Sequence, residues 1–162
     1  MVTQPADSWV FLTYRLPREP SAPRLALWRA TRRLGALQLG DGLVALPHST
    51  RNLEHVQWLA ADIAEHGGSA SVWHARADRR RDHEAHVAAL RDSVAAEYRV
   101  VQDEAATASA AQLSDSERRR LVRRLRGQLR RIGLRDHFDA PGRERARSAV
   151  DNLARPMESI TA

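Results

Sequence analysis

The first 77 residues alternate short apolar runs with segments of helical periodicity. Residues 8–15 form an apolar, aromatic and β-branched run that ends at Leu-Pro, which predicts a buried strand. After a proline-rich connection, apolar residues recur at helical spacing. This pattern predicts a helix from an N-cap at Ser21 to Leu34, where Gly35 ends it.

Two further apolar runs flank the Gly-Asp-Gly of residues 40–42, a sequence typical of a tight hairpin turn. A second helix is expected from Ser49 or Thr50 to the glycine pair at residues 67–68, and residues 69–75 have the composition of a fourth strand. The resulting order, strand-helix-strand-strand-helix-strand, is that of a split βαβ arrangement. We therefore predict an α+β fold with a ferredoxin-like sandwich over residues 1–77.

Residues 78–162 are expected to form a helical extension. One apolar stripe predicts a long helix that starts near residue 78. An arginine-rich helix follows, which opens with a capping box formed by Ser114 and Glu117 and closes at Gly133. A terminal helix is expected to start at Pro141.

Composition narrows the chemistry that this chain can perform. It contains no cysteine, which excludes disulfides, thiolate metal sites and cysteine nucleophiles. All 26 basic side chains are arginines, and residues 114–135 contain 9 of them against 2 acidic residues. No apolar run approaches the roughly 20 residues of a membrane-spanning helix, and the N-terminus lacks the features of a signal peptide. We expect a cytoplasmic protein that does not bind membranes.

The arginine-rich helix is the first candidate binding surface. Its apolar residues occupy one arc, and seven arginines fill the opposite arc, a separation that binding a phosphate backbone requires. The predicted nucleic-acid-binding residues are Arg119, Arg120, Arg123, Arg124, Arg126, Arg130 and Arg131. Two other interpretations stay open: a solvated face, and ion pairs with Glu97, Asp103 and Glu104 of the long helix. A membrane surface is the least favoured, because the apolar arc lacks aromatic anchors.

The second candidate is the stretch from Arg15 to Ala36, which places six arginines and a tryptophan around prolines. Arg24, Trp28 and Arg32 lie at i, i+4 and i+8, on a different side of the expected helix from its apolar residues. Guanidiniums around an indole favour an anion or nucleic-acid platform. The alternative is that Trp28 packs beneath the distal helices or a dimer mate while the arginines are solvated or pair with Glu19.

Metal-dependent and catalytic sites are not predicted. His83 and His86 lie at i, i+3, a spacing that can place two imidazoles on one metal, but the three arginines immediately before them would repel a cation. The sequence has no nucleophile elbow, phosphate loop or dinucleotide glycine pattern. We therefore expect no enzyme activity and no cofactor.

Several motifs together resemble the N-terminal domain of the ChrB family of chromate-resistance regulators. The stretch "WVFLTYRLPREPSAPRLALWRATRRLGALQLGDGLVALP" carries most of the resemblance, and "AAEYRVVQDE" and "LRDHFDAP" extend it. The matching positions are Pro20, Ser21, Arg24, Trp28, Arg29, Gly35, Ala36, Asp41, Gly42 and Pro47. The resemblance implies a cytoplasmic, homodimeric transcription regulator that binds the operator DNA of a chromate-efflux operon and has chromate as its effector.

Family members usually continue into a second, C-terminal domain, and we expect this chain to be a stand-alone form of the first domain. A tetrahedral dianion is best held by several fixed guanidiniums. The residues expected to bind the oxyanion are accordingly Arg15, Arg18, Ser21, Arg24, Trp28 and Arg29.

Two other functional classes are weaker. The expected sandwich also resembles the small nucleases of CRISPR adaptation at the level of the fold. These would need a metal-binding aspartate after the first strand, where this chain has Tyr14-Arg15-Leu16. The remaining alternative is a non-catalytic adaptor or dimerisation module that binds neither DNA nor chromate.

Overall fold

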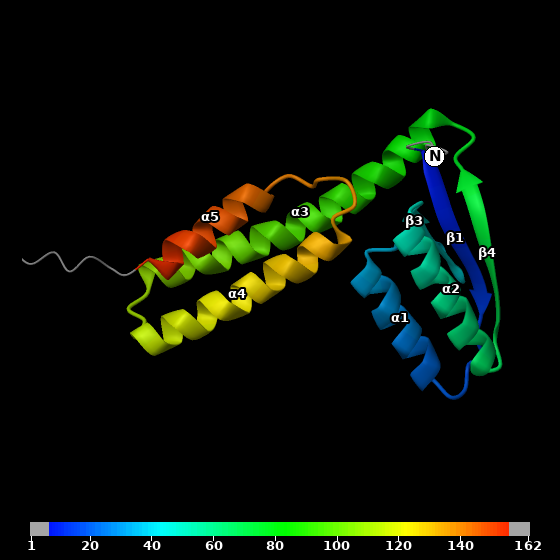
Figure 1. Ribbon diagram of the computed structural model, residues 1–162, viewed down its shortest axis with the longest axis horizontal. Coiled ribbons are helices and arrows are strands. Elements are labelled where there is room, and N and C mark those ends of the chain that lie inside the picture. The colour runs from blue at the N-terminus through cyan, green and yellow to red at the C-terminus, as the bar shows by residue number, and fades with distance from the viewer. Residues whose placement is uncertain (1–6, 156–162) are drawn as a thin grey trace, which may run out of the picture. The chain divides into compact units, whose positions relative to one another are not determined.

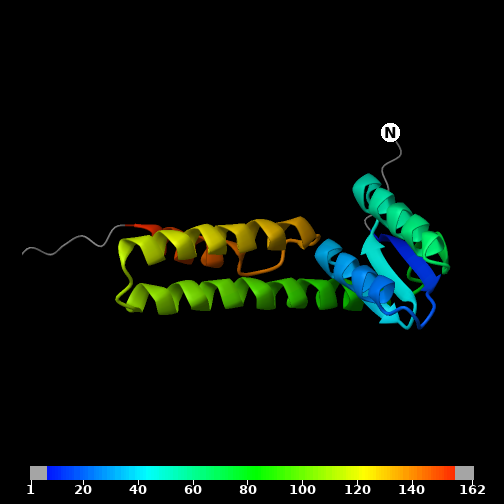
Figure 2. The ribbon, with the colours of Figure 1, turned by 90° about the horizontal axis from the view of Figure 1, so that it is seen from below.

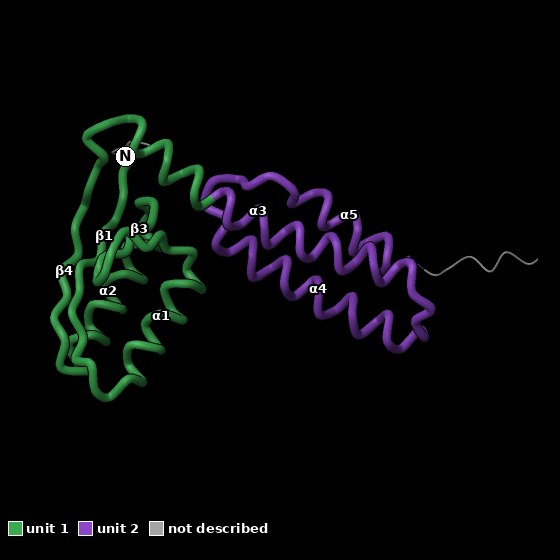
Figure 3. Tube along the Cα trace, turned by 180° about the vertical axis from the view of Figure 1, so that it is seen from behind, with its two compact units in different colours: residues 1–90 green, residues 91–162 purple. Residues whose placement is uncertain are grey.

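A computed structural model describes residues 7–155 of the chain. The chain divides into two compact units, residues 1–90 and residues 91–162 (Figure 3). Its elements, in chain order, are β1 (Ser8–Arg15), α1 (Ala22–Leu34), β2 (Leu37–Gly40), β3 (Leu43–Pro47), α2 (Thr50–Glu65), β4 (Ser69–Arg76), α3 (Arg80–Ala110), α4 (Asp115–Arg135) and α5 (Arg143–Ala154). The long helix α3 begins in the first unit and continues into the second.

Unit 1 is built on a four-stranded antiparallel sheet. The strand order is β2-β3-β1-β4, and Phe11 of the central strand β1 lies opposite Ala45 on one side and Trp73 on the other. Helices α1 and α2 cover one face of this sheet (Figure 1). Leu12 of β1 lies in that core with Val56 of α2. The predicted α+β class is confirmed.

Local sequence signals explain most boundaries in unit 1. Gly35 ends α1 in the left-handed region, with φ of 70°. Gly42 has φ of 73° in the turn between β2 and β3, and a Cβ there would clash with the carbonyl oxygen of Tyr14. Ser49 caps α2 by accepting a hydrogen bond from the backbone N–H of Asn52, at 3.0 Å. The boundaries at Gly35 and Ser49 depend on residues close together in the chain, whereas Gly42 must also leave space for Tyr14 of β1.

The predicted capping role of Ser21 is only half correct. Ser21 stands at the N-cap of α1, but its side chain makes no capping hydrogen bond. Its backbone has φ of −77° and ψ of −18°, which is helical. A capping serine normally needs an extended backbone to turn its hydroxyl toward the N–H groups of the first turn.

The first turns of α3 pack within unit 1. The indole N–H of Trp9, at the start of β1, donates to Nδ1 of His83 at 3.1 Å, and the indole ring makes edge contacts with His83 and His86. Trp9 is only 1% exposed. Both histidines therefore have a structural role against a buried tryptophan. The domain boundary placed between residues 77 and 78 stays a prediction, and the compact division itself falls after Leu90.

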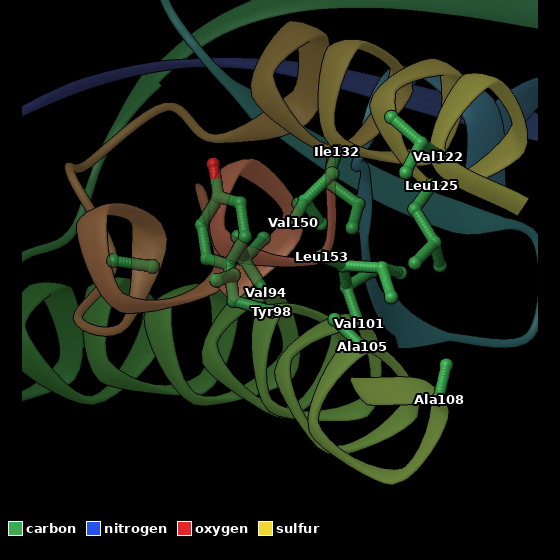
Figure 4. Close-up of a cluster of buried hydrophobic side chains, with 12 residues drawn as sticks. Val94, Tyr98, Val101, Ala105, Ala108, Val122, Leu125, Ile132, Val150 and Leu153 are labelled. Carbon is green, nitrogen blue, oxygen red and sulfur yellow. The ribbon is translucent and has the colours of Figure 1, made fainter. Parts of the chain in front are cut away.

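Unit 2 is a three-helix assembly. Helices α3 and α4 lie side by side (Figure 2), and side chains from α3, α4 and α5 point into one shared core (Figure 4). Tyr98 of α3, Leu125 of α4 and Leu153 of α5 are among its most buried members. The predicted capping box is present: Ser114 accepts from the backbone N–H of Glu117, and the carboxylate of Glu117 accepts from the backbone N–H of Ser114.

Two predicted helix ends in unit 2 were wrong. Helix α4 continues through Gly133 to Arg135 instead of closing at the glycine. Ile132, in its last turn, is buried in the core, so packing holds this turn in helical form. Helix α5 begins at Arg143 rather than at Pro141, because Gly142 stands at its N-cap with a left-handed φ of 101°.

Candidate nucleic-acid interface

The arginine-rich surface of α4 faces solvent. The capping box fixes the start of the helix, and the burial of Val122, Leu125 and Ile132 fixes its rotation against the core. The seven arginines predicted to bind nucleic acid are all exposed. The predicted separation of an apolar arc from a basic arc is therefore confirmed, while the role of the basic arc stays a prediction.

Four of these arginines form one straight stripe. Arg119, Arg123, Arg126 and Arg130 lie at i, i+4, i+7 and i+11 along α4, a spacing that places side chains above one another on the same face of a helix. At 1.5 Å per residue the stripe extends over about 16 Å. A row of guanidiniums of that length can contact several phosphates of one strand.

Ion pairs divide the seven arginines into two groups. Arg124 pairs with Glu104 of α3, a contact that raises the pKa of its guanidinium. Arg126 pairs with Asp151 of α5 at 3.0 Å. The expected pairing with the long helix thus holds for Arg124.

The other five arginines have no carboxylate within ion-pair distance among residues 7–155. These five are Arg119, Arg120, Arg123, Arg130 and Arg131. Their positive charge is not neutralised by the described part of the chain. It is therefore available to an external anion.

The arginine and tryptophan residues of the opening stretch also face solvent. Trp28 is 54% exposed, and the guanidinium of Arg32 lies over its ring, 5.2 Å from the centroid. The expected contact between an indole and a flanking guanidinium is therefore present, and the described residues do not bury Trp28. No ion pair with Glu19 forms among residues 7–155.

The six residues expected to bind an oxyanion come from the end of β1, the connection that follows it and α1. Arg15 lines a hollow formed by residues 13–15, 41–43 and 69–71, and this hollow includes none of the other five. On α1, Arg24 and Trp28 share a face, whereas Arg29 lies five residues beyond Arg24 and points to a different side. Ser21, at the N-cap, directs no side-chain hydrogen bond to the helix. Oxyanion binding by this set stays a prediction.

Two arginines that the sequence analysis did not single out lie beside α4. Arg143 and Arg147 of α5 line the same groove as Arg126, Arg130 and Arg131 of α4. Their i, i+4 spacing on a short helix was visible in the sequence. They become candidates only because they lie beside the arginines of α4. The packing of α5 against α4 places them there, and the sequence pattern does not show that packing.

The described residues contain neither a metal-binding cluster nor a membrane-spanning helix. Within residues 7–155, no group of three or more histidine and acidic side chains is placed to hold a metal ion. None of the described helices combines the length and the apolar character needed to cross a membrane.

Comparison with known proteins places this chain in a family. No solved structure matches it. Protein ChrB of Cupriavidus metallidurans is 34% identical over 130 residues, which cover 75% of this chain and 36% of that protein. The chain thus spans about a third of the length of this curated relative. A family model described as "Protein ChrB, N-terminal" matches residues 24–162, and the chain therefore belongs to the ChrB N-terminal family.

Proposed function

We propose that this protein is a chromate-responsive transcriptional regulator, or an accessory protein of chromate resistance, that binds DNA through the arginine surface of α4. The family relationship supports the link to chromate resistance. The observation that carries DNA binding is the set of five exposed α4 arginines without a carboxylate partner among residues 7–155.

The physical basis of the proposal is counterion release. Each phosphate that an arginine neutralises releases condensed counterions from DNA, so affinity rises with the number of such contacts and falls steeply with salt. The stripe presents the unpaired guanidiniums of Arg119, Arg123 and Arg130 in a row, together with that of Arg126, which pairs with Asp151. Arginine also donates paired hydrogen bonds to phosphate oxygens, which lysine cannot match geometrically.

The chromate response is assigned to the exposed arginines of unit 1. Arg24 on α1 lies on the same helix face as Trp28, and Arg32 lies over the indole ring. A planar guanidinium beside an exposed indole offers hydrogen bonds to an oxyanion and a fluorescent reporter of its binding. The homodimer, the operator and the cytoplasmic location stay predictions.

We also propose that unit 1 has a ferredoxin-like fold. The chain order of strands and helices, the antiparallel sheet and the two helices on one face support it. Fold alone does not imply function, so the proposed role depends on the arginine surfaces.

A second candidate function is protein–protein contact, and exposed tryptophans favour it. Trp58 is 76% exposed, Trp73 is 55% exposed and Trp28 is 54% exposed. Tryptophan is enriched among the residues that dominate binding energy at protein interfaces. An adaptor of this kind would bind a partner protein and be indifferent to DNA and chromate.

The decisive experiment measures binding of a fluorescently labelled duplex from the region upstream of the protein's own gene, across a series of salt concentrations. Wild-type protein should bind with an affinity that falls steeply with salt and changes on addition of chromate but not of sulfate. The variant R119Q/R123Q should bind more weakly and with a shallower salt dependence.

The matched control is R99Q/R145Q, which removes the same charge from exposed positions of α3 and α5 outside the stripe. Equal losses in the two double variants would show that only net charge matters. Binding to a protein partner, with no affinity for DNA or chromate, would establish the adaptor function instead.

A further inference from the structure

A groove of about 930 Å³ lies between α4 and α5, entirely within unit 2. Its rim carries five arginines, three from α4 and two from α5. They are Arg126, Arg130, Arg131, Arg143 and Arg147. Among the described residues that line the groove, the one carboxylate is that of Asp151, which already pairs with Arg126. The groove is therefore strongly cationic.

Two guanidiniums of the groove lie close to glycines of α4. A Cβ built on Gly127 would lie 3.6 Å from Nη1 of Arg131, and one built on Gly133 would lie 3.8 Å from Nη2 of Arg143. Both glycines line the groove. These distances place the ends of Arg131 and Arg143 close to the α4 backbone.

The floor of the groove belongs to the core of unit 2. Val150 of α5 and Tyr98 of α3 line it, and both are almost fully buried in the core of unit 2. The hydroxyl of Tyr98 donates to Oδ2 of Asp136 at 3.0 Å, and Oδ1 of the same carboxylate accepts from the backbone N–H of Ala140 at 2.8 Å. These bonds tie α3 to the segment that connects the two walls of the groove.

The unpaired positive charge of the groove favours binding of an external anion. Four of its arginines have no carboxylate partner among residues 7–155. They are Arg130, Arg131, Arg143 and Arg147. Gathering like charges on two packed helices costs free energy, which binding of a multiply charged anion offsets.

The stripe of arginines on α4 favours a nucleic-acid strand as that anion. Arg126 and Arg130 belong both to the stripe and to the rim of the groove, so the two surfaces are continuous. A nucleic-acid strand supplies a row of charges that can follow the stripe and then enter the groove. One small anion can be held by two or three guanidiniums and would leave the remaining charges of this surface unmatched.

We propose that the groove between α4 and α5 binds backbone phosphates of a nucleic-acid strand, with Arg143 and Arg147 as contacts additional to those of α4. This inference rests on the proposed DNA-binding function and extends it to a second helix. No comparison assigns a role to α5.

The test compares wild type, R143Q/R147Q and the charge-matched control R99Q/R145Q by fluorescence anisotropy with a labelled duplex over a salt series. Each lost phosphate contact lowers the slope of log affinity against log salt by about 0.9, so R143Q/R147Q should lower it by about 1.8. At about 0.1 M salt this corresponds to a loss of affinity on the order of 60-fold. The control should change affinity only a few-fold, and circular dichroism should show all three proteins equally helical.

Three outcomes would overturn the inference. If R143Q/R147Q and the control have the same slope while R119Q/R123Q has a shallower one, DNA binding stands and the groove has no part in it. If wild type binds no DNA at all, the proposed function and this inference fail together. If inorganic pyrophosphate binds wild type but not R143Q/R147Q, and the DNA slope is unchanged, the groove is a site for a free anion.

Discussion

Replacing Tyr98 by phenylalanine tests whether its bond to Asp136 holds unit 2 together. Tyr98 is 1% exposed, and its hydroxyl donates to Asp136 at 3.0 Å. The substitution removes one oxygen and keeps the ring, so it leaves no sizeable cavity in the core. Its effect therefore isolates the hydrogen bond that links α3 to the start of the α4–α5 connection.

The expected cost follows from the partners of that bond. Asp136 is half-buried and keeps its second hydrogen bond, from the backbone N–H of Ala140. A hydrogen bond to a charged group contributes about 1.5 to 3 kcal/mol. Partial access of water to the carboxylate places the loss toward the lower end, at about 1.5 kcal/mol. For a chain of this size that loss corresponds to a melting temperature lower by roughly 3 to 6 °C.

Urea unfolding followed with two optical probes measures this loss of unfolding free energy and shows which unit is destabilised. All four tryptophans lie in unit 1, at positions 9, 28, 58 and 73, so their fluorescence reports that unit. Far-UV circular dichroism reports the helices of both units. In Y98F the dichroism transition should move to lower urea, and the fluorescence shows whether unit 1 unfolds with unit 2. A loss below about 0.5 kcal/mol would refute the reasoning, since even neutral hydrogen bonds contribute that much.

Alkaline pH gives an independent check. Burial, followed by the bond to Asp136, raises the pKa of Tyr98 from about 10 to about 12. The folded state therefore retains a proton that the unfolded chain releases. The resulting stabilisation is fully present below pH 10 and is lost as pH rises from about 10 to about 12. Y98F should therefore lack this component of the wild-type pH dependence.

Three further substitutions probe the helices and the sheet. Ser114→Ala removes the acceptor for the backbone N–H of Glu117 and should lower the free energy of unfolding by about 1 kcal/mol in a thermal melt; an unchanged melt would show that the capping box is not stabilising. Gly127→Ala should raise stability by up to about 1 kcal/mol, because the added methyl makes only ordinary contact with Arg131; a lower melting temperature would reveal strain that this distance does not show. Leu12→Ala, in the core of unit 1, should cost about 2 to 5 kcal/mol, measured by the tryptophan fluorescence transition; a cost under about 1 kcal/mol would contradict its place in that core.

The elements were largely predictable because their signals are local. The first strand, the glycine stop of α1 and the serine cap of α2 each depend on residues within a few positions of one another. The capping box of α4 is equally local. The end of α4 was misplaced at Gly133 because burial of Ile132 sustains the last turn, and burial depends on helices distant in the chain.

The candidate sites divide in the same way, into features set by neighbouring residues and features set by packing between distant elements. The sequence alone determined the chain order of strands and helices, the amphipathic character of α4 and the concentration of arginines on one of its arcs, because periodicity and charge are properties of neighbouring residues. Only the tertiary structure decided which of those arginines stay unpaired. Arg124 meets Glu104 across 20 positions and Arg126 meets Asp151 across 25. It also decided that Arg143 and Arg147 face α4, because the packing of three helices sets which faces meet.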